Sequence, residues 1–154
     1  DKIILIDNAS TDGTPQLLEE RGYLANPVMD YVRLRENTGG AGGFYEGVKR
    51  AYQAGYDFFW LMDDDTRPMQ DSLLQLYSSF SVLDEKVGYV CSRVEWVDGK
   101  PHFMNIASVS AIVNGVPFNY YEKRNLYIIN SCSFVSVLIA KEAVGKSGFP
   151  LKEM

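Results

Sequence analysis

Short apolar runs alternate with segments of helical periodicity along the first 95 residues of the chain. Each run is rich in β-branched or aromatic side chains and ends in polar or turn-forming residues, which is typical of strands buried in a parallel sheet. Strands are predicted at residues 3–6, 31–34, 58–62 and 87–94. We expect the first of them to lie in the interior of the sheet.

Between these runs, apolar residues at spacings of three and four indicate amphipathic helices. Helices are predicted from Thr14, as the N-cap, to Gly22, from Phe44 to Ala54, and from Asp71 to Leu83. Parallel neighbours need a crossover connection, and helices then cover both faces of the sheet. The pattern therefore predicts an α/β fold with a mostly parallel sheet.

The pattern changes after about residue 95. Asp98-Gly99 and Asn114-Gly115 are β-hairpin signals, because both residues of such pairs tolerate positive φ. They predict an antiparallel excursion from the parallel sheet. Residues 128–140 then return as one long or two short strands, followed by a short helix over 141–144.

Composition excludes several classes of partner. The chain has 20 acidic and 15 basic residues, a formal net charge of −5 and no basic run, which argues against nucleic acid as a partner. No apolar stretch approaches the roughly 20 residues needed to cross a bilayer. Cys91 and Cys132 lie far apart in apolar segments, without the spacing of a zinc site or a disulfide scaffold, which favours a reduced, intracellular domain.

Polar loops follow three of the predicted strands, and the carboxyl edge of an open α/β sheet is where ligands bind. Residues 7–14 are dense in short donors and acceptors, although an Asx turn with a helix cap explains them equally well. Residues 37–43 hold four glycines, which would let backbone N–H groups approach a phosphate. This segment lacks the Walker lysine and the G-x-G-x-x-G pattern, so a plain flexible turn remains an alternative. We expect the loops to converge.

Asp63, Asp64 and Asp65 give the strongest signal, because three adjacent carboxylates at a strand end repel each other unless a cation or donors offset that cost. Hard oxygen ligands suit Mg²⁺ or Mn²⁺. In extended geometry Asp63 and Asp65 point to the same side, so they are the predicted metal pair. The alternative is a solvated acidic loop.

The order and spacing of these loops resemble inverting family 2 glycosyltransferases with the GT-A fold. The resemblance rests on Asp7–Thr14, Glu36–Phe44 and Trp60–Asp65, and it extends through about residue 76. The Gly-Gly-Ala-Gly-Gly-Phe and triple-Asp forms are similar to bacterial galactofuranosyl- and rhamnosyltransferase-like members that build cell-wall or surface polysaccharides.

The resemblance implies roles for individual residues. In this family the positions of Asp7 and Asn8 contact the base and ribose of the donor, and many members have two acids there. The Asp-x-Asp motif binds the metal through Asp63 and Asp65 and bridges it to the donor diphosphate. The implied nucleotide-sugar-binding residues are Asp7, Asn8, Asn37, Gly39, Gly40, Asp63 and Asp64.

The resemblance also implies an activity and its setting. We expect a metal-dependent transferase, with Mn²⁺ or Mg²⁺, that moves a sugar such as galactofuranose or rhamnose from a UDP- or dTDP-linked donor with inversion. The acceptor is a polysaccharide or a lipid-linked carbohydrate. The expected location is cytoplasmic, with membrane association of the full-length protein at the inner face left open together with the oligomeric state.

Parts of the family domain are expected outside these residues. Family members have a strand ahead of the one at Ile3, and their general base lies in an acidic stretch after the position of Met154. No catalytic residue is therefore assigned within the chain, which by itself is expected to bind without transferring. Residues 1–154 are predicted to be one partial domain, with a nucleotide-sugar half over 1–95 and a β-rich acceptor side over 96–154.

Two other functions stay open. A nucleotide-binding module without catalysis would carry the same fold, since fold does not fix function. A nucleotidyltransferase would share the metal site but predicts a basic glycine-rich loop, and residues 39–43 contain no Lys or Arg. Aromatic residues of the excursion could stack on an acceptor sugar or pack in the core. They are Phe118, Tyr120, Tyr121 and Tyr127.

Overall fold

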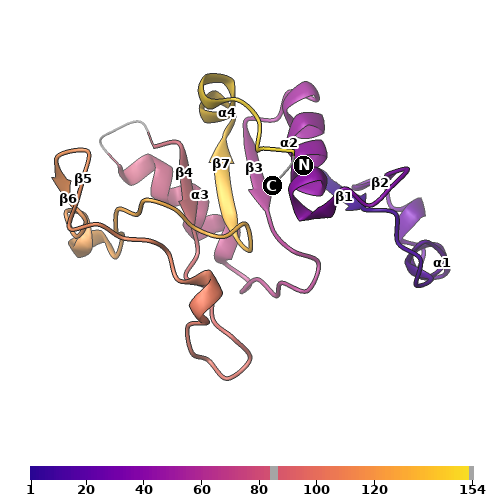
Figure 1. Ribbon diagram of the computed structural model, residues 1–154, viewed down its shortest axis with the longest axis horizontal. Coiled ribbons are helices and arrows are strands. Elements are labelled where there is room, and N and C mark those ends of the chain that lie inside the picture. The colour runs from indigo at the N-terminus through magenta and orange to yellow at the C-terminus, as the bar shows by residue number, and fades with distance from the viewer. Residues whose placement is uncertain (84–86, 153–154) are drawn as a thin grey trace. The chain divides into compact units, whose positions relative to one another are not determined.

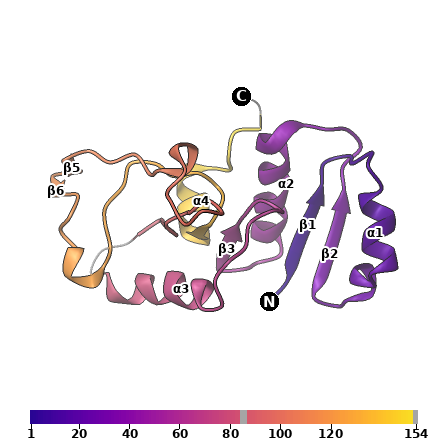
Figure 2. The same cartoon turned by 90° about the horizontal axis from the view of Figure 1, so that it is seen from below.

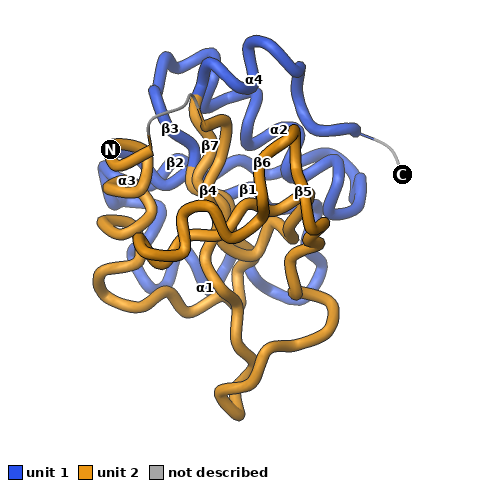
Figure 3. The backbone as a smooth tube through the Cα atoms, turned by 90° about the vertical axis from the view of Figure 1, so that its left-hand side faces the viewer, with its two compact units in different colours: residues 1–59, 141–154 blue, residues 60–140 orange. Residues whose placement is uncertain are grey.

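The computed structural model describes residues 1–83 and 87–152 (Figure 1). The chain divides into two compact units, one formed by residues 1–59 with 141–154 and the other by residues 60–140 (Figure 3). Parallel and antiparallel strand pairs occur together with α-helices. The predicted α/β class is therefore confirmed. No described helix has the length and apolar character required to traverse a bilayer.

In unit 1, β1 (Ile3–Asp7) and β2 (Met29–Arg33) pair in parallel and run side by side (Figure 2). They are connected through α1 (Thr14–Glu20) and the 3₁₀ turn η1 (Tyr23–Ala25). The register sets Asp7 opposite Arg33, at the carboxyl ends of both strands. The long helix α2 (Gly39–Gln53) packs on β1.

The core of unit 1 lies on the inner face of α2, where Val48 is fully buried. The chain returns to this unit with α4 (Lys141–Ser147). Beyond α4, the ring of Phe149 makes edge-to-face contacts with Tyr45 and Tyr52 of α2, at centroid distances of 5.8 and 5.5 Å. These contacts hold the last described segment on the helix.

The prediction of an interior first strand is wrong, because β1 pairs with β2 alone within the described residues. Ile3 is 55% exposed, and Asp7 is the one buried residue of the strand. An apolar run indicates that its side chains tend to be buried. It does not indicate how many strands pair with it. The number of neighbours is decided by tertiary structure.

A three-stranded sheet, most of which lies in unit 2, has β7 (Val137–Ala140) in the middle, between β3 (Phe58–Leu61) and β4 (Tyr89–Cys91). β4 and β7 are antiparallel. The helix α3 (Ser72–Val82) packs near β4. Leu138 of β7 is almost completely buried and anchors the core of this unit.

The excursion contains the predicted hairpin, in which β5 (Ile112–Val113) pairs antiparallel with β6 (Val116–Pro117). Asn114 has φ 51° and Gly115 has φ 82°, as a two-residue turn between right-twisted strands requires. The Asp98-Gly99 signal gives a longer turn, closed by an isolated antiparallel bridge between Glu95 and Pro101.

Two predicted strands are shorter in the structure. The run at 87–94 forms a strand only over Tyr89–Cys91, and the run at 128–140 only over Val137–Ala140. A strand ends where its partner stops supplying hydrogen bonds, which an apolar run does not reveal.

The aromatic residues after β6 lie largely at the surface. Tyr120 is 64% and Tyr127 is 50% exposed, and the rings of Phe118 and Tyr127 stack at a centroid distance of 6.3 Å. The alternative that these rings pack in the core is therefore wrong for Tyr120 and Tyr127. Stacking on an acceptor sugar stays a prediction.

Candidate functional site

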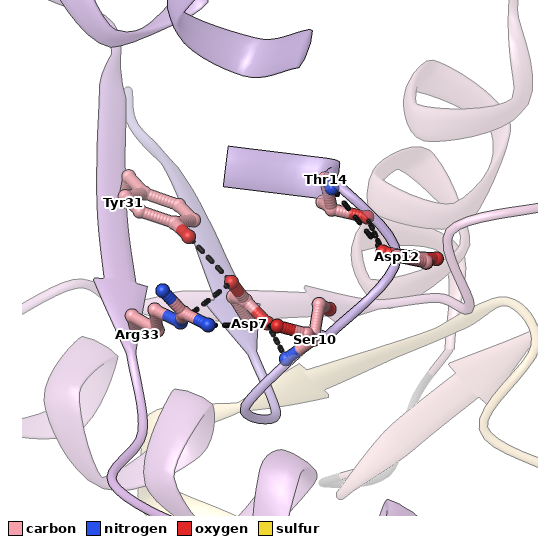
Figure 4. Close-up of polar contacts among 6 residues, drawn as sticks. All are labelled: Asp7, Ser10, Asp12, Thr14, Tyr31 and Arg33. Atoms are coloured by element: carbon pink, nitrogen blue, oxygen red, sulfur yellow. Dashed lines mark hydrogen bonds and ion pairs between the residues drawn. The ribbon is translucent and has the colours of Figure 1, made fainter. Parts of the chain in front are cut away.

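The carboxylate of Asp7 organises the loop that follows β1. Asp7 is 5% exposed, and its Oδ1 accepts a hydrogen bond from the Ser10 backbone N–H at 2.7 Å. From β2, the Tyr31 hydroxyl donates to Oδ2 at 2.5 Å, and Arg33 Nε lies 3.5 Å from the same oxygen (Figure 4). Arg33 also donates to the carbonyl of Ser10 at 2.7 Å. The loop is thereby tied to the neighbouring strand.

These partners keep Asp7 ionised. Burial acts to raise the pKa of Asp7, but the hydrogen bonds from Ser10 and Tyr31, together with the charge of Arg33, outweigh it and lower the pKa. Burial, the hydrogen bond to Asp7 and the charge of that carboxylate raise the pKa of Tyr31. Tyr31 and Arg33 lie two residues apart on one strand and so share a face, but only the β1–β2 register connects them with Asp7.

The start of α1 differs from the prediction. Gly13 occupies the N-cap with φ 85°, so the prediction of Thr14 as the cap is wrong. Asp12 Oδ1 instead accepts hydrogen bonds from the Thr14 N–H at 3.2 Å and hydroxyl at 2.6 Å (Figure 4). These bonds lower the pKa of the Asp12 carboxyl. The turn is a local Asx arrangement rather than a binding group.

Asn8 joins the loop after β1 to the start of α2. Its Oδ1 accepts hydrogen bonds from the Thr38 backbone N–H at 2.9 Å and hydroxyl at 3.2 Å, and its Nδ2 donates to the Gly39 carbonyl at 2.8 Å. The structure thus brings the first two predicted loops together. A carboxylate could accept from Thr38 but could not donate to Gly39, which gives a physical reason for an amide where many family members have an acid.

The glycine-rich segment is mostly helix. α2 begins at Gly39, so the prediction of a loop through residue 43 is wrong. Asn37 Oδ1 accepts the Gly39 N–H at 2.9 Å, and Gly39 has φ 69°, a conformation that glycine adopts without strain. A Cβ on Gly42 would lie 2.1 Å from the Thr38 hydroxyl oxygen. Because Gly42 has no side chain, the first turn of α2 leaves room for the side chain of Thr38, which is hydrogen-bonded to Asn8.

The triple-Asp segment in unit 2 forms a turn rather than an extended strand. β3 ends at Leu61, and the Thr66 N–H donates to the Asp63 carbonyl at 3.2 Å. The extended geometry used to select the metal pair is therefore wrong. Across residues 1–83 and 87–152, no hydrogen bond or ion pair engages the exposed side chains of Asp63, Asp64 and Asp65.

The electrostatics of this turn favour a cation. Burial and the charges of Asp65 and then Asp64 raise the pKa of Asp63, so Asp65 has the larger influence of the two. Asp63 and Asp65 as the metal pair stay a prediction. Within the described part of the chain, no three acidic, His or Cys side chains converge as a metal cluster, so a cation here would take other ligands from water or a substrate.

Sequence reasoning missed Thr66. Its hydroxyl oxygen is buried and has no hydrogen-bond partner in the part of the chain that the structure describes. A buried hydroxyl without a partner is costly, so it marks a place for a ligand or a water molecule. No sequence signal identifies it, because the burial of this hydroxyl depends on the tertiary structure.

The predicted site residues belong to two units. Asp7, Asn8, Asn37, Gly39 and Gly40 lie in unit 1, where the contacts of Asn8 bring them together. The triple-Asp turn lies in unit 2. Convergence of all three loops, and the roles of the individual residues, stay predictions.

Comparison with known proteins identifies the relatives of this chain. Residues 1–145 match the sequence profile of glycosyl transferase family 2. Galactofuranosyltransferase GlfT1 of Mycolicibacterium smegmatis is 41% identical over 75 residues, which are 48% of this chain and 23% of that protein. The poly-beta-1,6-N-acetyl-D-glucosamine synthase of Staphylococcus aureus is 29% identical over 96% of this chain and 34% of its own length. The chain thus spans at most about a third of these relatives.

A solved structure shares the fold. It is the mannosyltransferase PcManGT from Pyrobaculum calidifontis in complex with GDP-Man and Mn²⁺, with a TM-score of 0.59 and 18% identity. The match covers 99% of this chain and 39% of that protein. It confirms the GT-A fold expected from the resemblance.

The contact between Gly42 and Thr38 can be tested with two neighbouring glycines. Gly42→Ala should destabilise the protein by about 1–3 kcal/mol, because the new methyl group collides with the Thr38 side chain and disturbs its bonds to Asn8. Gly40→Ala meets nothing within 4 Å and should stabilise α2 by about 0.5–1 kcal/mol. Urea unfolding measures both, and equal effects would show that the close approach is absent.

The Tyr31–Asp7 bond predicts a change in acid stability. A lowered pKa of Asp7 contributes stability above its unfolded value of 3.8, and this is lost as the pH falls through the folded value. Tyr31→Phe should cost about 1.5–3 kcal/mol at neutral pH and start acid unfolding at a higher pH. Tyr23→Phe, at a residue 47% exposed, is the control. The same acid transition in both variants would contradict the assignment.

Proposed function

Because the chain belongs to glycosyl transferase family 2, we propose that it is the donor-binding part of an enzyme that transfers a sugar from a nucleoside diphosphate to a carbohydrate or lipid-linked acceptor. The observation that carries this proposal is the clamp of Asn8, which fixes the loop after β1 against the start of α2. Residues 1–95 would form the nucleotide-sugar half and residues 96–154 the acceptor side.

The nucleotide would lie over the ends of β1 and β2. Asp7 keeps acceptor capacity at Oδ1, which receives one hydrogen bond, and Asn8 keeps one N–H of its amide. Both suit the edge of a pyrimidine base and a ribose hydroxyl. Asn37, Gly39 and Gly40 would border the pocket, where the first N–H groups of α2 favour negative charge.

The triple-Asp turn fits a divalent cation. Its side chains are hard oxygen donors without partners among the described residues, and the orphaned Thr66 hydroxyl is close by in sequence. Asp63 and Asp65 would hold Mn²⁺ or Mg²⁺, and Asp63 and Asp64 would face the donor. When bound, the cation supplies positive charge that stabilises the departing diphosphate.

The proposed reaction is a single displacement with inversion at the anomeric carbon. Asp7 and Asn8 would orient the donor so that the acceptor hydroxyl attacks in line with the leaving diphosphate. We place the general base C-terminal to Met154 and assign no catalytic residue within the chain. Galactofuranose on UDP is the favoured donor because of the similarity to a galactofuranosyltransferase, with rhamnose on dTDP as the second candidate.

The acceptor is proposed to be a bacterial polysaccharide or its lipid-linked precursor. The exposed rings of Tyr120 and Tyr127 would stack on its sugars. Inner-face membrane association of the full-length protein belongs to the same proposal.

Calorimetric titration tests the donor site. UDP or dTDP should bind this chain in Mn²⁺ and lose at least about tenfold in affinity, ~1.4 kcal/mol, in EDTA or in Asp65→Asn. Asp98→Asn, in a turn outside the proposed site, should bind normally. If Asp65→Asn bound the nucleotide as well as the wild type, the metal assignment would be wrong. If the full-length protein bound nucleotide but transferred no sugar, a non-catalytic module would be favoured.

Thr66→Val should have two opposite effects. Replacing the orphaned hydroxyl with a methyl group of equal shape should raise the free energy of unfolding by about 1 kcal/mol, because the cost of the unpaired group disappears. The same change should weaken Mn²⁺-dependent nucleotide binding, while Thr66→Ser preserves it. Chemical unfolding and calorimetry of both variants provide the check, and normal binding by Thr66→Val would exclude the hydroxyl from the site.

A further inference from the structure

Two cysteines that are distant in sequence meet in unit 2. Cys91 ends β4, and Cys132 lies in the segment that leads into β7. Each thiol shifts the pKa of the other, and both are free, half-buried thiols. The sequence showed no paired spacing, so this juxtaposition is a product of the tertiary fold.

Hydrogen bonds on both sides of the thiols fix the juxtaposition. On one side, the Ser92 N–H donates to the Ser136 carbonyl at 3.0 Å, and the two serine hydroxyls are 3.0 Å apart. On the other side, the Tyr89 hydroxyl donates to the Asn130 carbonyl at 3.4 Å. The segment bearing Cys132 is therefore held along β4 before and after the cysteine.

The pair is chemically asymmetric. The interaction with Cys91 lowers the pKa of Cys132 against the opposing effect of burial. The same interaction, followed by burial, raises the pKa of Cys91. Cys132 is thus the nucleophile and Cys91 the resolving thiol. No third Cys, His, Asp or Glu in the described ranges completes a metal cluster with them.

We propose that Cys91 and Cys132 form a dithiol site that low-molecular-weight disulfides oxidise reversibly to an intramolecular disulfide. The Cys132 thiolate attacks one sulfur of the small disulfide, forms a mixed disulfide and releases one thiolate. Cys91 then loses its proton to solvent and attacks the Sγ of Cys132, which releases the second small thiol. The protein loses two electrons and two protons, and the small disulfide is reduced to two thiols.

The bond would fasten the excursion to the sheet. Residues 92–131 lie between the two cysteines, so oxidation closes this segment into a loop anchored on β4. Cross-linking reduces the freedom of the unfolded chain, and it should therefore raise the thermal unfolding midpoint. This inference does not depend on the proposed transferase activity.

The test is to incubate the folded protein with oxidised glutathione and map the peptides without reduction. The wild-type chain should give a Cys91–Cys132 link, no retained glutathione and a higher unfolding midpoint that dithiothreitol reverses. Cys91→Ser should accumulate one glutathione on Cys132, because the resolving thiol is missing. Cys132→Ser should react more slowly than Cys91→Ser, because the remaining thiol has the raised pKa.

Three results would overturn the proposal. They are a stable glutathione adduct on the wild-type chain without the internal link, a link only between different molecules, and equal reaction rates in Cys91→Ser and Cys132→Ser. Ser133→Ala is the matched control, since it changes a hydroxyl beside Cys132 and leaves both thiols in place.

Discussion

Burial of the Asp7 carboxylate is the constraint on which the loop after β1 and its contacts with β2 depend. A buried charge is tolerated only when hydrogen bonds and an opposite charge replace its lost hydration, and here Ser10, Tyr31 and Arg33 supply them. Two of these partners come from β2, so the carboxylate also fixes how the ends of the two parallel strands meet. Asn8, the next residue, then connects this loop with the start of α2 through the hydrogen bonds of its amide group.

The two acidic regions differ in how their charge is compensated. Asp7 finds its partners within the protein and is held ionised, so its main effect is to shape the loop. Burial and the neighbouring charges of Asp65 and Asp64 raise the pKa of Asp63, which has no compensating donor among the described residues. Under our proposal, a divalent cation would supply this compensation from outside the chain. This contrast explains why Asp7 organises its loop, while the triple-Asp turn is the place where we propose a cation.

Unit 2 depends on a different set of polar contacts. The Trp60 indole N–H donates to the Ser136 hydroxyl at 3.1 Å, and that hydroxyl also contacts Ser92. These bonds connect β3 with the segments that carry Cys91 and Cys132. One chain of hydrogen bonds therefore runs from Trp60, in the strand before the triple-Asp turn, through Ser136 to Ser92, the residue after Cys91.

The sequence by itself determined the α/β class, the strands at the start of the chain, the Asn114-Gly115 turn and the family, because local periodicity, turn chemistry and short motifs decide them. It could not determine that β1 has a single partner, that α2 begins at Gly39, or that the triple-Asp segment turns. These features depend on which distant groups supply hydrogen bonds. The tertiary structure alone decided the partners of Asp7 and Asn8 and the meeting of the two thiols, since each joins residues that no sequence spacing relates.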